Sequence, residues 1–411
     1  MAKTLDVYLH NKLVGYLTQD DDGQMLFEYA PTWLEASEAV PLSQSLPLRK
    51  IIFTRKECRG FFAGILPEEN KRDIIARNLG ISARNDFAML ERIGGECAGA
   101  ITFVTAGELL PEGQDTYRCL GDKELAKILR ELPRRPLMAG EEGVRLSLAG
   151  AQDKIAVHVS GNDISVPLRG APSTHILKPA IERFEGVVFN EAVCMSLAGK
   201  VGLPTARVAI GKVEGIDYLL VERYDRTRGS EGNMRRLHQE DFCQALGVIP
   251  ERKYQSEGGP TLKQCFDLVR NVSAAPVIDL QRLLDAMIFH ALIGNHDAHA
   301  KNFSLLYGEE HSVRLAPLYD VVSTVYYPEL SQYLAMKIGG ESVSDRLFPQ
   351  HFGKLAEEAG LAKPMVIRRV PELTHKVLTR LQDIEIDHEV ASQVLAQIKK
   401  RCEAFLLRFK K

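Results

Sequence analysis

The sequence contains two polar motifs that carry candidate functional residues, and the first directly follows a stretch of apolar sequence. The motifs read Gly294-Asn295-His296-Asp297-Ala298-His299-Ala300-Lys301-Asn302 and Leu318-Tyr319-Asp320. They place an aspartate, an asparagine five residues later, and a second aspartate eighteen residues after that asparagine. Glycine commonly ends helices in a left-handed conformation, so Gly294 is predicted to end an apolar core helix over residues 280–293. The Asp297–Asn302 segment is therefore predicted to be a loop on a rigid scaffold.

This order of side chains matches the protein-kinase template. There, the first aspartate accepts the proton of the substrate hydroxyl, while the asparagine and the later aspartate hold magnesium on the phosphates. Asp297 is assigned the first role, and Asn302 and Asp320 the second. Carboxylate and amide oxygens suit this hard cation. Because D-x4-N also occurs often by chance, other segments must support the assignment.

A lysine and a glutamate upstream agree with the same template. Lys178 ends a predicted strand over residues 174–177, and Glu191 lies thirteen residues later in a helix predicted over residues 190–200. Kinases use such a lysine–glutamate pair to position nucleotide phosphates. Each residue alone is better explained as a solvated surface charge. Their order and their elements favour the catalytic interpretation.

Two further segments are candidates for nucleotide contact. The first is a small-residue loop that lets backbone N–H groups approach a phosphate, and it equally fits a plain hairpin turn. It reads Ala149-Gly150-Ala151-Gln152-Asp153-Lys154 and matches neither a Walker loop nor a standard kinase glycine-rich loop. The second, Glu222-Arg223-Tyr224, ends a predicted strand where kinases bind adenine through linker backbone. An ordinary strand end with a salt bridge explains it equally well.

Composition restricts the class of protein. The 411 residues are 45% hydrophobic and 26% charged with a net charge of −2, so no global field favours nucleic acid or an anionic membrane. Seven cysteines without a C-x-x-C pair disfavour a disulfide framework or a zinc cluster and suit a reducing cytoplasm. No signal peptide or membrane span is predicted. We expect a cytoplasmic enzyme.

The chain is predicted to be an α+β protein of three parts. Residues 1–108 form a small β-rich N-terminal module that starts with an antiparallel meander and includes a helix over residues 67–79. Residues 109–225 form a connection and a β-rich lobe, with strands at 144–148, 155–159, 164–168, 174–177, 206–210 and 218–222. Residues 226–411 form a mostly helical lobe, with helices at 280–293, 365–381 and 390–409. The nucleotide is expected in the cleft between the two lobes.

Taken together and in order, the motifs resemble the HipA kinases, the toxin halves of bacterial toxin-antitoxin pairs. The resemblance covers nearly the whole chain and is carried by five motifs: 147–152 (SLAGAQ), 221–225 (VERYD), 239–241 (QED), 299–302 (HAKN) and 319–320 (YD). It implies ATP and Mg²⁺ as cofactors and phosphorylation of serine or threonine in a protein.

The resemblance also implies residue roles. Asp297 is the proton acceptor, Lys178 the phosphate lysine, and Asn302 and Asp320 the metal-side ligands. Residues 149–154 match the phosphate loop and 222–224 the adenine linker, while His299, Ala300, Lys301, Asn302, Tyr319 and Asp320 match the remaining nucleotide contacts. Ser147 matches a serine that such kinases phosphorylate on themselves, which is expected to inactivate the enzyme.

Partners follow from the same resemblance. It implies a HipB-like helix-turn-helix antitoxin dimer and, as protein substrate, an aminoacyl-tRNA synthetase whose inactivation stalls translation and favours dormancy and persistence. After Leu334-Ala335-Met336-Lys337 the chain continues Gly339-Gly340-Glu341-Ser342, without the family's basic DNA-contacting cluster. We therefore expect operator DNA to be bound indirectly, through the antitoxin.

Two rival hypotheses stay open on the residues alone. One is an HD-type metal phosphohydrolase that uses His290, His296, Asp297 and Asp320. It leaves Lys178 and Glu191 unexplained. The other is a catalytically inactive corepressor that only binds the antitoxin. The presence of all the predicted catalytic residues argues against it, because folding alone does not require them.

Overall fold

The computed structural model describes residues 2–110, 116–181, 183–229, 234–308 and 312–410. The chain divides into two compact units: residues 1–179, 211–251 and 306–311 form the first, and residues 180–210, 252–305 and 312–411 form the second. Each unit is described by itself. The mixture of helix and sheet confirms the predicted α+β class. No helix among the described residues is long and apolar enough to cross a bilayer.

The first unit opens with the predicted meander. Strands β1 (Lys3–Leu9), β2 (Lys12–Gln19) and β3 (Met25–Tyr29) pair antiparallel, and β4 (Ile101–Thr105) adds to β1, giving the order β3-β2-β1-β4. The helices of this region are α1 (Pro31–Leu34), α2 (Arg55–Gly64), α3 (Glu69–Leu79) and α4 (Asp86–Ile93). Helix α3 ends at Leu79, as predicted, and the left-handed Gly80 caps it. Buried aromatic rings join sheet to helix, with Phe27 and Phe62 centred 5.1 Å apart.

A second, six-stranded sheet has the order β5-β7-β6-β8-β10-β9. Its strands are β5 (Thr116–Cys119), β6 (Ile155–Ser160), β7 (Asp163–Leu168), β8 (His175–Pro179), β10 (Ile216–Glu222) and β9 (Val208–Val213), which crosses between the units. Strands β6 and β7 form an antiparallel hairpin that turns at Gly161, because Ser160 pairs with Asp163. The strand predicted over residues 144–148 is wrong: Leu146 makes a single bridge to Glu96. The apolar side chains of residues 144–148 are buried, but this segment makes no continuous pairing with another strand.

Smaller elements complete the first unit. They are α5 (Asp122–Glu131), the hairpin strands β11 (Arg226–Arg228) and β12 (Met234–Arg236), β13 (His238–Asp241) and α7 (Phe242–Ala245). The first unit also contains a buried ionic cluster in which Arg223 and Arg226 bind Glu96 and Asp225. Burial alone raises the pKa of Glu96, but the two guanidinium groups outweigh it and lower that pKa to about 2.

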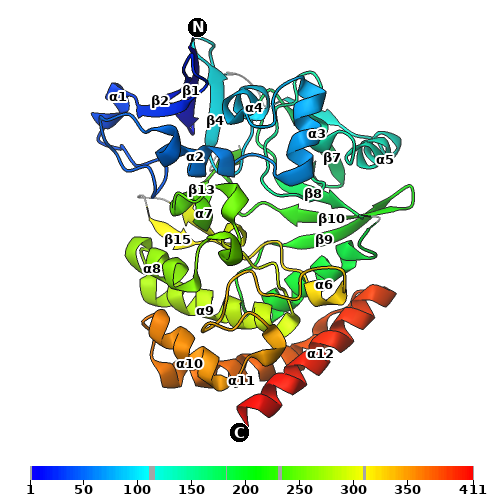
Figure 1. Ribbon diagram of the computed structural model, residues 1–411. Coiled ribbons are helices and arrows are strands. Elements are labelled where there is room, and N and C mark those ends of the chain that lie inside the picture. The colour runs from blue at the N-terminus through cyan, green and yellow to red at the C-terminus, as the bar shows by residue number, and fades with distance from the viewer. Residues whose placement is uncertain (1, 111–115, 182, 230–233, 309–311, 411) are drawn as a thin grey trace. The chain divides into compact units, whose positions relative to one another are not determined.

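The second unit is mostly helical. Its helices are α6 (Val187–Lys200), α8 (Leu262–Val272), α9 (Pro276–Ile293), α10 (Pro349–Glu358), α11 (Lys363–Arg380) and α12 (Glu389–Phe409). Its strand β15 (Val313–Leu315) pairs with β14 (Ser304–Tyr307), whose first two residues belong to this unit and whose last two belong to the first. Helix α9 packs against α8, α11 and α12 (Figure 1). Asp285 interrupts the apolar face of α9 and forms a bidentate ion pair with Arg369 of α11. Helix α9 is thus the buried scaffold that leads into the predicted loop.

Candidate active site

The loop after α9 begins at Gly294, whose φ of +72° ends the helix as predicted. A Cβ at this position would lie 2.4 Å from Val325 Cγ2, so only glycine fits. Arg401 of α12 donates to the carbonyl oxygens of Ala291 and Leu292, at 2.9 and 3.2 Å. These carbonyls belong to the last turn of α9, where helical partners are lacking. A cationic side chain therefore fixes the helix end from which the loop departs.

Asp297 is the one exposed residue between Ala291 and Leu305. Its backbone is held by three hydrogen bonds. Its N–H donates to Asn295 Oδ1 at 3.0 Å, and its carbonyl accepts from Asn302 Nδ2 at 2.9 Å and from the His299 N–H at 2.8 Å. The loop is thus rigid while the carboxylate faces solvent. A general base needs this combination of fixed backbone and accessible side chain.

The segment after Asp320 braces the same loop. The His296 N–H donates to Thr324 Oγ1 at 2.8 Å, and Ser323 Oγ donates to the Ile293 carbonyl at 2.7 Å. The side-chain amide of Asn190 in α6 makes two hydrogen bonds to the backbone of Ser323: Nδ2 donates to its carbonyl and Oδ1 accepts from its N–H. These roles of Asn190 and Ser323 were not predicted, because single polar residues in sequence carry no sign of such pairing.

The two predicted metal-side ligands lie on adjoining segments. Tyr319 Oη donates to the Lys301 carbonyl at 2.7 Å, so residues next to Asp320 and to Asn302 are in contact. Asp320 has a φ of +53°, a left-handed backbone that residues other than glycine rarely adopt. Such strain is often found at functional positions. One carboxylate and one amide oxygen fit Mg²⁺ that takes its other ligands from phosphates and water.

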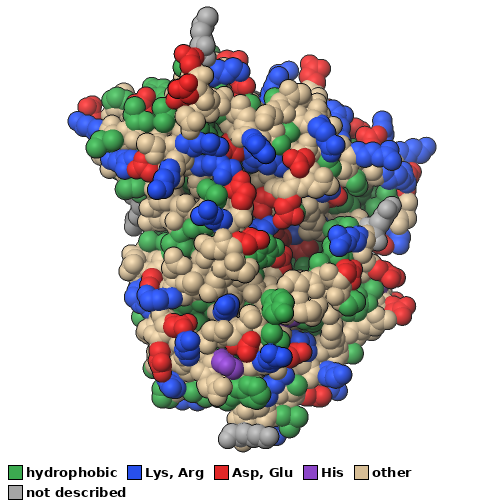
Figure 2. Space-filling model, viewed as in Figure 1, with side chains coloured by type: hydrophobic (Ala, Val, Ile, Leu, Met, Phe, Trp, Pro, Cys, Tyr) green, Lys and Arg blue, Asp and Glu red, His purple; other side chains and the backbone are tan. Residues whose placement is uncertain are grey.

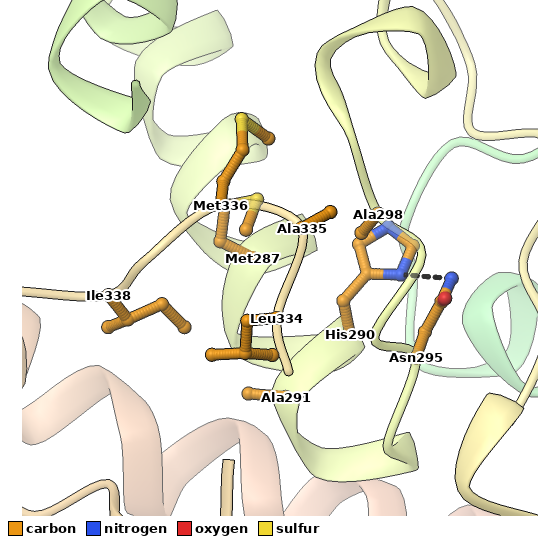
Figure 3. A pocket seen from close by; sticks show the side chains of 9 residues that line it. All are labelled: Met287, His290, Ala291, Asn295, Ala298, Leu334, Ala335, Met336 and Ile338. Atoms are coloured by element: carbon orange, nitrogen blue, oxygen red, sulfur yellow. Dashed lines mark hydrogen bonds between the residues drawn. The ribbon is translucent and has the colours of Figure 1, made fainter. Parts of the chain in front are cut away.

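The histidines of the rival metal-site hypothesis are engaged in other bonds. His290 lies in the wall of a small cavity behind the loop, where its Nδ1 accepts from Asn295 Nδ2 at 3.1 Å (Figure 3). Burial lowers the pKa of His290 to about 4, so it is neutral. His296 bonds the Ser331 carbonyl through Nδ1 and Ser344 Oγ through Nε2. No group of three or more metal-binding side chains occurs in the described part of the chain. The phosphohydrolase hypothesis therefore lacks its ligand cluster.

The predicted phosphate loop, in the first unit, is held by its own lysine. Lys154 Nζ donates to the Ala149 carbonyl at 2.7 Å, and Gly150 has a φ of +104°. A Cβ at Gly150 would lie 2.8 Å from that ammonium. Asp153 forms an ion pair with Lys71 at 2.6 Å. Ser147, just before the loop, is fully buried and donates to the Ile65 carbonyl at 3.0 Å.

The remaining predicted residues are distributed over both units. Lys178 lies in β8 and is buried, opposite Leu219 of β10. Glu191 is buried in α6, in the second unit. The linker residue Arg223 donates its backbone N–H to the Thr174 carbonyl, and its side chain belongs to the ionic cluster. Glu222 is exposed, and the Tyr224 hydroxyl donates to Gln239.

Glu240, the central residue of the 239–241 motif, is buried and hydrogen-bonded within the first unit. Its carboxylate accepts from Ser43 Oγ, from the Gln44 N–H at 3.0 Å and from the Tyr307 hydroxyl. Burial raises the pKa of Glu240 to about 7 despite these donors. The Glu240 carboxylate thus links the segments around residues 43–44 and 307 within the first unit.

Comparison with known proteins identifies the family to which the chain is similar. Residues 5–104 match the model of the HipA N-terminal domain, and residues 146–381 match that of the HipA-like C-terminal domain. The chain is 46% identical over 403 residues to Y4mE of Sinorhizobium fredii, which is named as a candidate kinase, covering 94% of each chain. It is 31% identical over 425 residues to the serine/threonine-protein kinase toxin HipA of Shewanella oneidensis, covering 98% of this chain and 96% of that one.

A solved structure gives the same result for the fold. The complex of Shewanella oneidensis HipA, HipB and operator DNA contains a chain that matches with a TM-score of 0.86 and 28% identity. The match covers 99% of this chain and 98% of that chain. With both family models and a full-length relative above 30% identity, this chain belongs to the HipA family of serine/threonine-protein kinases.

Proposed function

We propose that the protein transfers the γ-phosphate of Mg-ATP to serine or threonine hydroxyls and acts as the toxin of a toxin-antitoxin pair. The observation that carries the proposal is the exposed Asp297 carboxylate on a loop whose other residues are buried and braced. Labelled phosphate appearing in protein serine or threonine, and lost when Mg²⁺ is chelated, tests it.

The residue roles in this proposal follow the kinase template. Asp297 accepts the proton of the substrate hydroxyl, while Asn302 and Asp320 hold Mg²⁺, which neutralises charge on the phosphates. Lys178 positions phosphate with the support of Glu191. The 149–154 loop contributes backbone donors, and the 222–224 segment contributes backbone to adenine, since the Arg223 guanidinium is engaged with Glu96 and Asp225.

We expect Ser147 to be phosphorylated by the enzyme itself. Its hydroxyl is buried against Ile65, and its N–H donates to the Glu96 carbonyl, so phosphorylation requires the segment to leave these contacts. A phosphoserine adds roughly −1.5 to −2 charges, which repel the nucleotide and favour the released loop. After incubation with Mg-ATP, mass spectrometry should find phosphate on Ser147, with faster hydrogen exchange at 145–154 and weaker ATP binding.

Two variants are the controls for this expectation. Asp297→Asn should leave Ser147 unmodified, and Ser147→Ala should keep its initial activity without the later inactivation. If phosphorylated enzyme kept full ATP affinity, the inactivation mechanism would be wrong while the kinase assignment survived.

We further propose a small dimeric helix-turn-helix antitoxin as partner, with operator DNA bound mainly through it. The complex of the Shewanella relative with HipB and operator DNA supports this. The net charge is −2, and acidic and basic side chains are interspersed over the visible face of the helical unit (Figure 2). Strong phosphate binding needs clustered cations. The purified chain should bind operator weakly, and tight salt-sensitive binding by the chain alone would refute this expectation.

An aminoacyl-tRNA synthetase is the proposed protein substrate, on the resemblance to HipA toxins. Incubation of the enzyme and labelled ATP with a purified panel of synthetases should label one of them. An unlabelled panel, with labelling of another protein in host extract, would overturn this choice of substrate.

A further inference from the structure

A tyrosine far from the catalytic motif contacts the proposed base. The Tyr254 hydroxyl donates to Asp297 Oδ1 at 2.8 Å, although the two residues are 43 positions apart in sequence. An ionised carboxylate only accepts, so the phenol is necessarily the donor. Hydrogen bonds to a charged acceptor are roughly twice as strong as neutral ones. This bond therefore restricts a side chain whose terminal torsion is otherwise broad.

The position of Tyr254 is itself fixed by backbone hydrogen bonds. The next residue, Gln255, donates its N–H to the Ala335 carbonyl at 3.1 Å and accepts the Lys337 N–H on its side-chain oxygen at 2.7 Å. Ala335 in turn donates its N–H to the carbonyl of His296, the neighbour of Asp297, at 2.8 Å. These bonds close a ring through three segments: 254–255, 296–297 and 335–337. Met336 of the third segment and His290 both line the cavity behind the loop (Figure 3).

A second contact orients the phenol ring. The rings of Tyr254 and His299 are centred 5.3 Å apart and lie edge to face at 76°. His299 is buried and is part of the same catalytic loop. The phenol ring is thus fixed by the hydrogen-bonded 254–255 segment on one side and by the His299 ring of the catalytic loop on the other, so its orientation is restricted.

We propose that Tyr254 is a positioning residue for phosphate transfer. It holds Oδ1 of Asp297 so that Oδ2 is presented to the substrate hydroxyl and receives its proton. This inference rests on the proposed role of Asp297. Tyr254 acts through that carboxylate, so its loss affects the maximal rate rather than nucleotide binding.

The test uses Tyr254→Phe, which removes only the hydroxyl. The rate of transfer from labelled Mg-ATP to the chain's own serine and threonine residues should fall roughly 10-fold at saturating ATP, the scale of one charged hydrogen bond. The half-saturating ATP concentration should change less than about twofold. The matched control is Tyr326→Phe, whose lost hydroxyl donates to Gln393 of α12, and it should keep the wild-type rate.

A double variant separates positioning from a structural role. In the Asp297→Ala background there is no carboxylate to hold, so adding Tyr254→Phe should not lower the residual rate further. A further 10-fold fall in the rate of the double variant would overturn the proposal. A Tyr254→Phe chain that transfers phosphate at or above the wild-type rate, while Asp297→Ala is inactive, would overturn it as well. Asp297→Ala at the wild-type rate, or no transfer by the wild type, would instead refute the proposed function itself.

Discussion

Replacing Asp297 by asparagine is expected to lower the maximal rate of phosphate transfer by about 100-fold or more, the usual scale for a positioned general base. The amide has the same shape as the carboxylate but cannot accept the substrate proton. The bonds that hold the loop at this position use its backbone N–H and carbonyl, so they persist in the variant. Fold and ATP affinity should therefore stay nearly unchanged.

Three measurements check this expectation: single-turnover transfer from labelled ATP, calorimetric ATP affinity and thermal unfolding. Asp267→Asn is a matched control, because Asp267 lies in α8 and pairs at the surface with Lys263 and Arg270. It should keep the wild-type rate. A wild-type rate in Asp297→Asn would reject the assignment of Asp297.

Replacing Asp320 by alanine is expected to abolish Mg²⁺-dependent nucleotide binding. The change removes a charged ligand of the proposed metal site and leaves only the neutral Asn302 amide. Alanine also tolerates the φ of +53° at this position less well than aspartate does. Part of the effect of this variant can therefore arise from the backbone.

Asp320→Asn separates the two effects, because asparagine tolerates left-handed backbone and has the shape of aspartate. We expect it to unfold at the wild-type temperature and to lose at least about tenfold in Mg²⁺-dependent affinity for ATP, because even the loss of a residue that only orients a metal ligand has an effect of about this size. Titration with ATP in the presence and absence of Mg²⁺ measures this. An unchanged Mg²⁺ dependence in a folded Asp320→Asn chain would contradict the metal-side role.

The helical scaffold was predictable because its signals are local. Apolar spacing in residues 280–293 followed by glycine predicts both the helix and its end, and α9 ends there. Other local signals were overlooked: Thr54–Glu57 and Thr261–Gln264 are capping boxes that start α2 and α8. Their T-x-x-E and T-x-x-Q patterns can be read directly from the sequence.

Contacts between distant segments were not predictable in this way. Residues 144–148 have the apolar alternation of a strand, but Glu96 provides one bridge instead of a paired strand. Tyr254 meets Asp297 only because Gln255 is tied to Ala335 and Lys337. The left-handed backbone of Asp320 was not predictable either, because the residue is not a glycine and its sequence gives no sign of a positive φ. A single sequence identifies candidate catalytic residues by type and spacing, whereas the tertiary structure determines what orients them.

Transfer of labelled γ-phosphate from Mg-ATP to protein is the most direct test of the kinase mechanism. The wild-type chain should incorporate label into serine or threonine, with incorporation abolished by chelating Mg²⁺ and reduced about 100-fold or more in Asp297→Asn. No incorporation by a folded, ATP-binding wild-type chain, either into itself or into protein of a host extract, would contradict it.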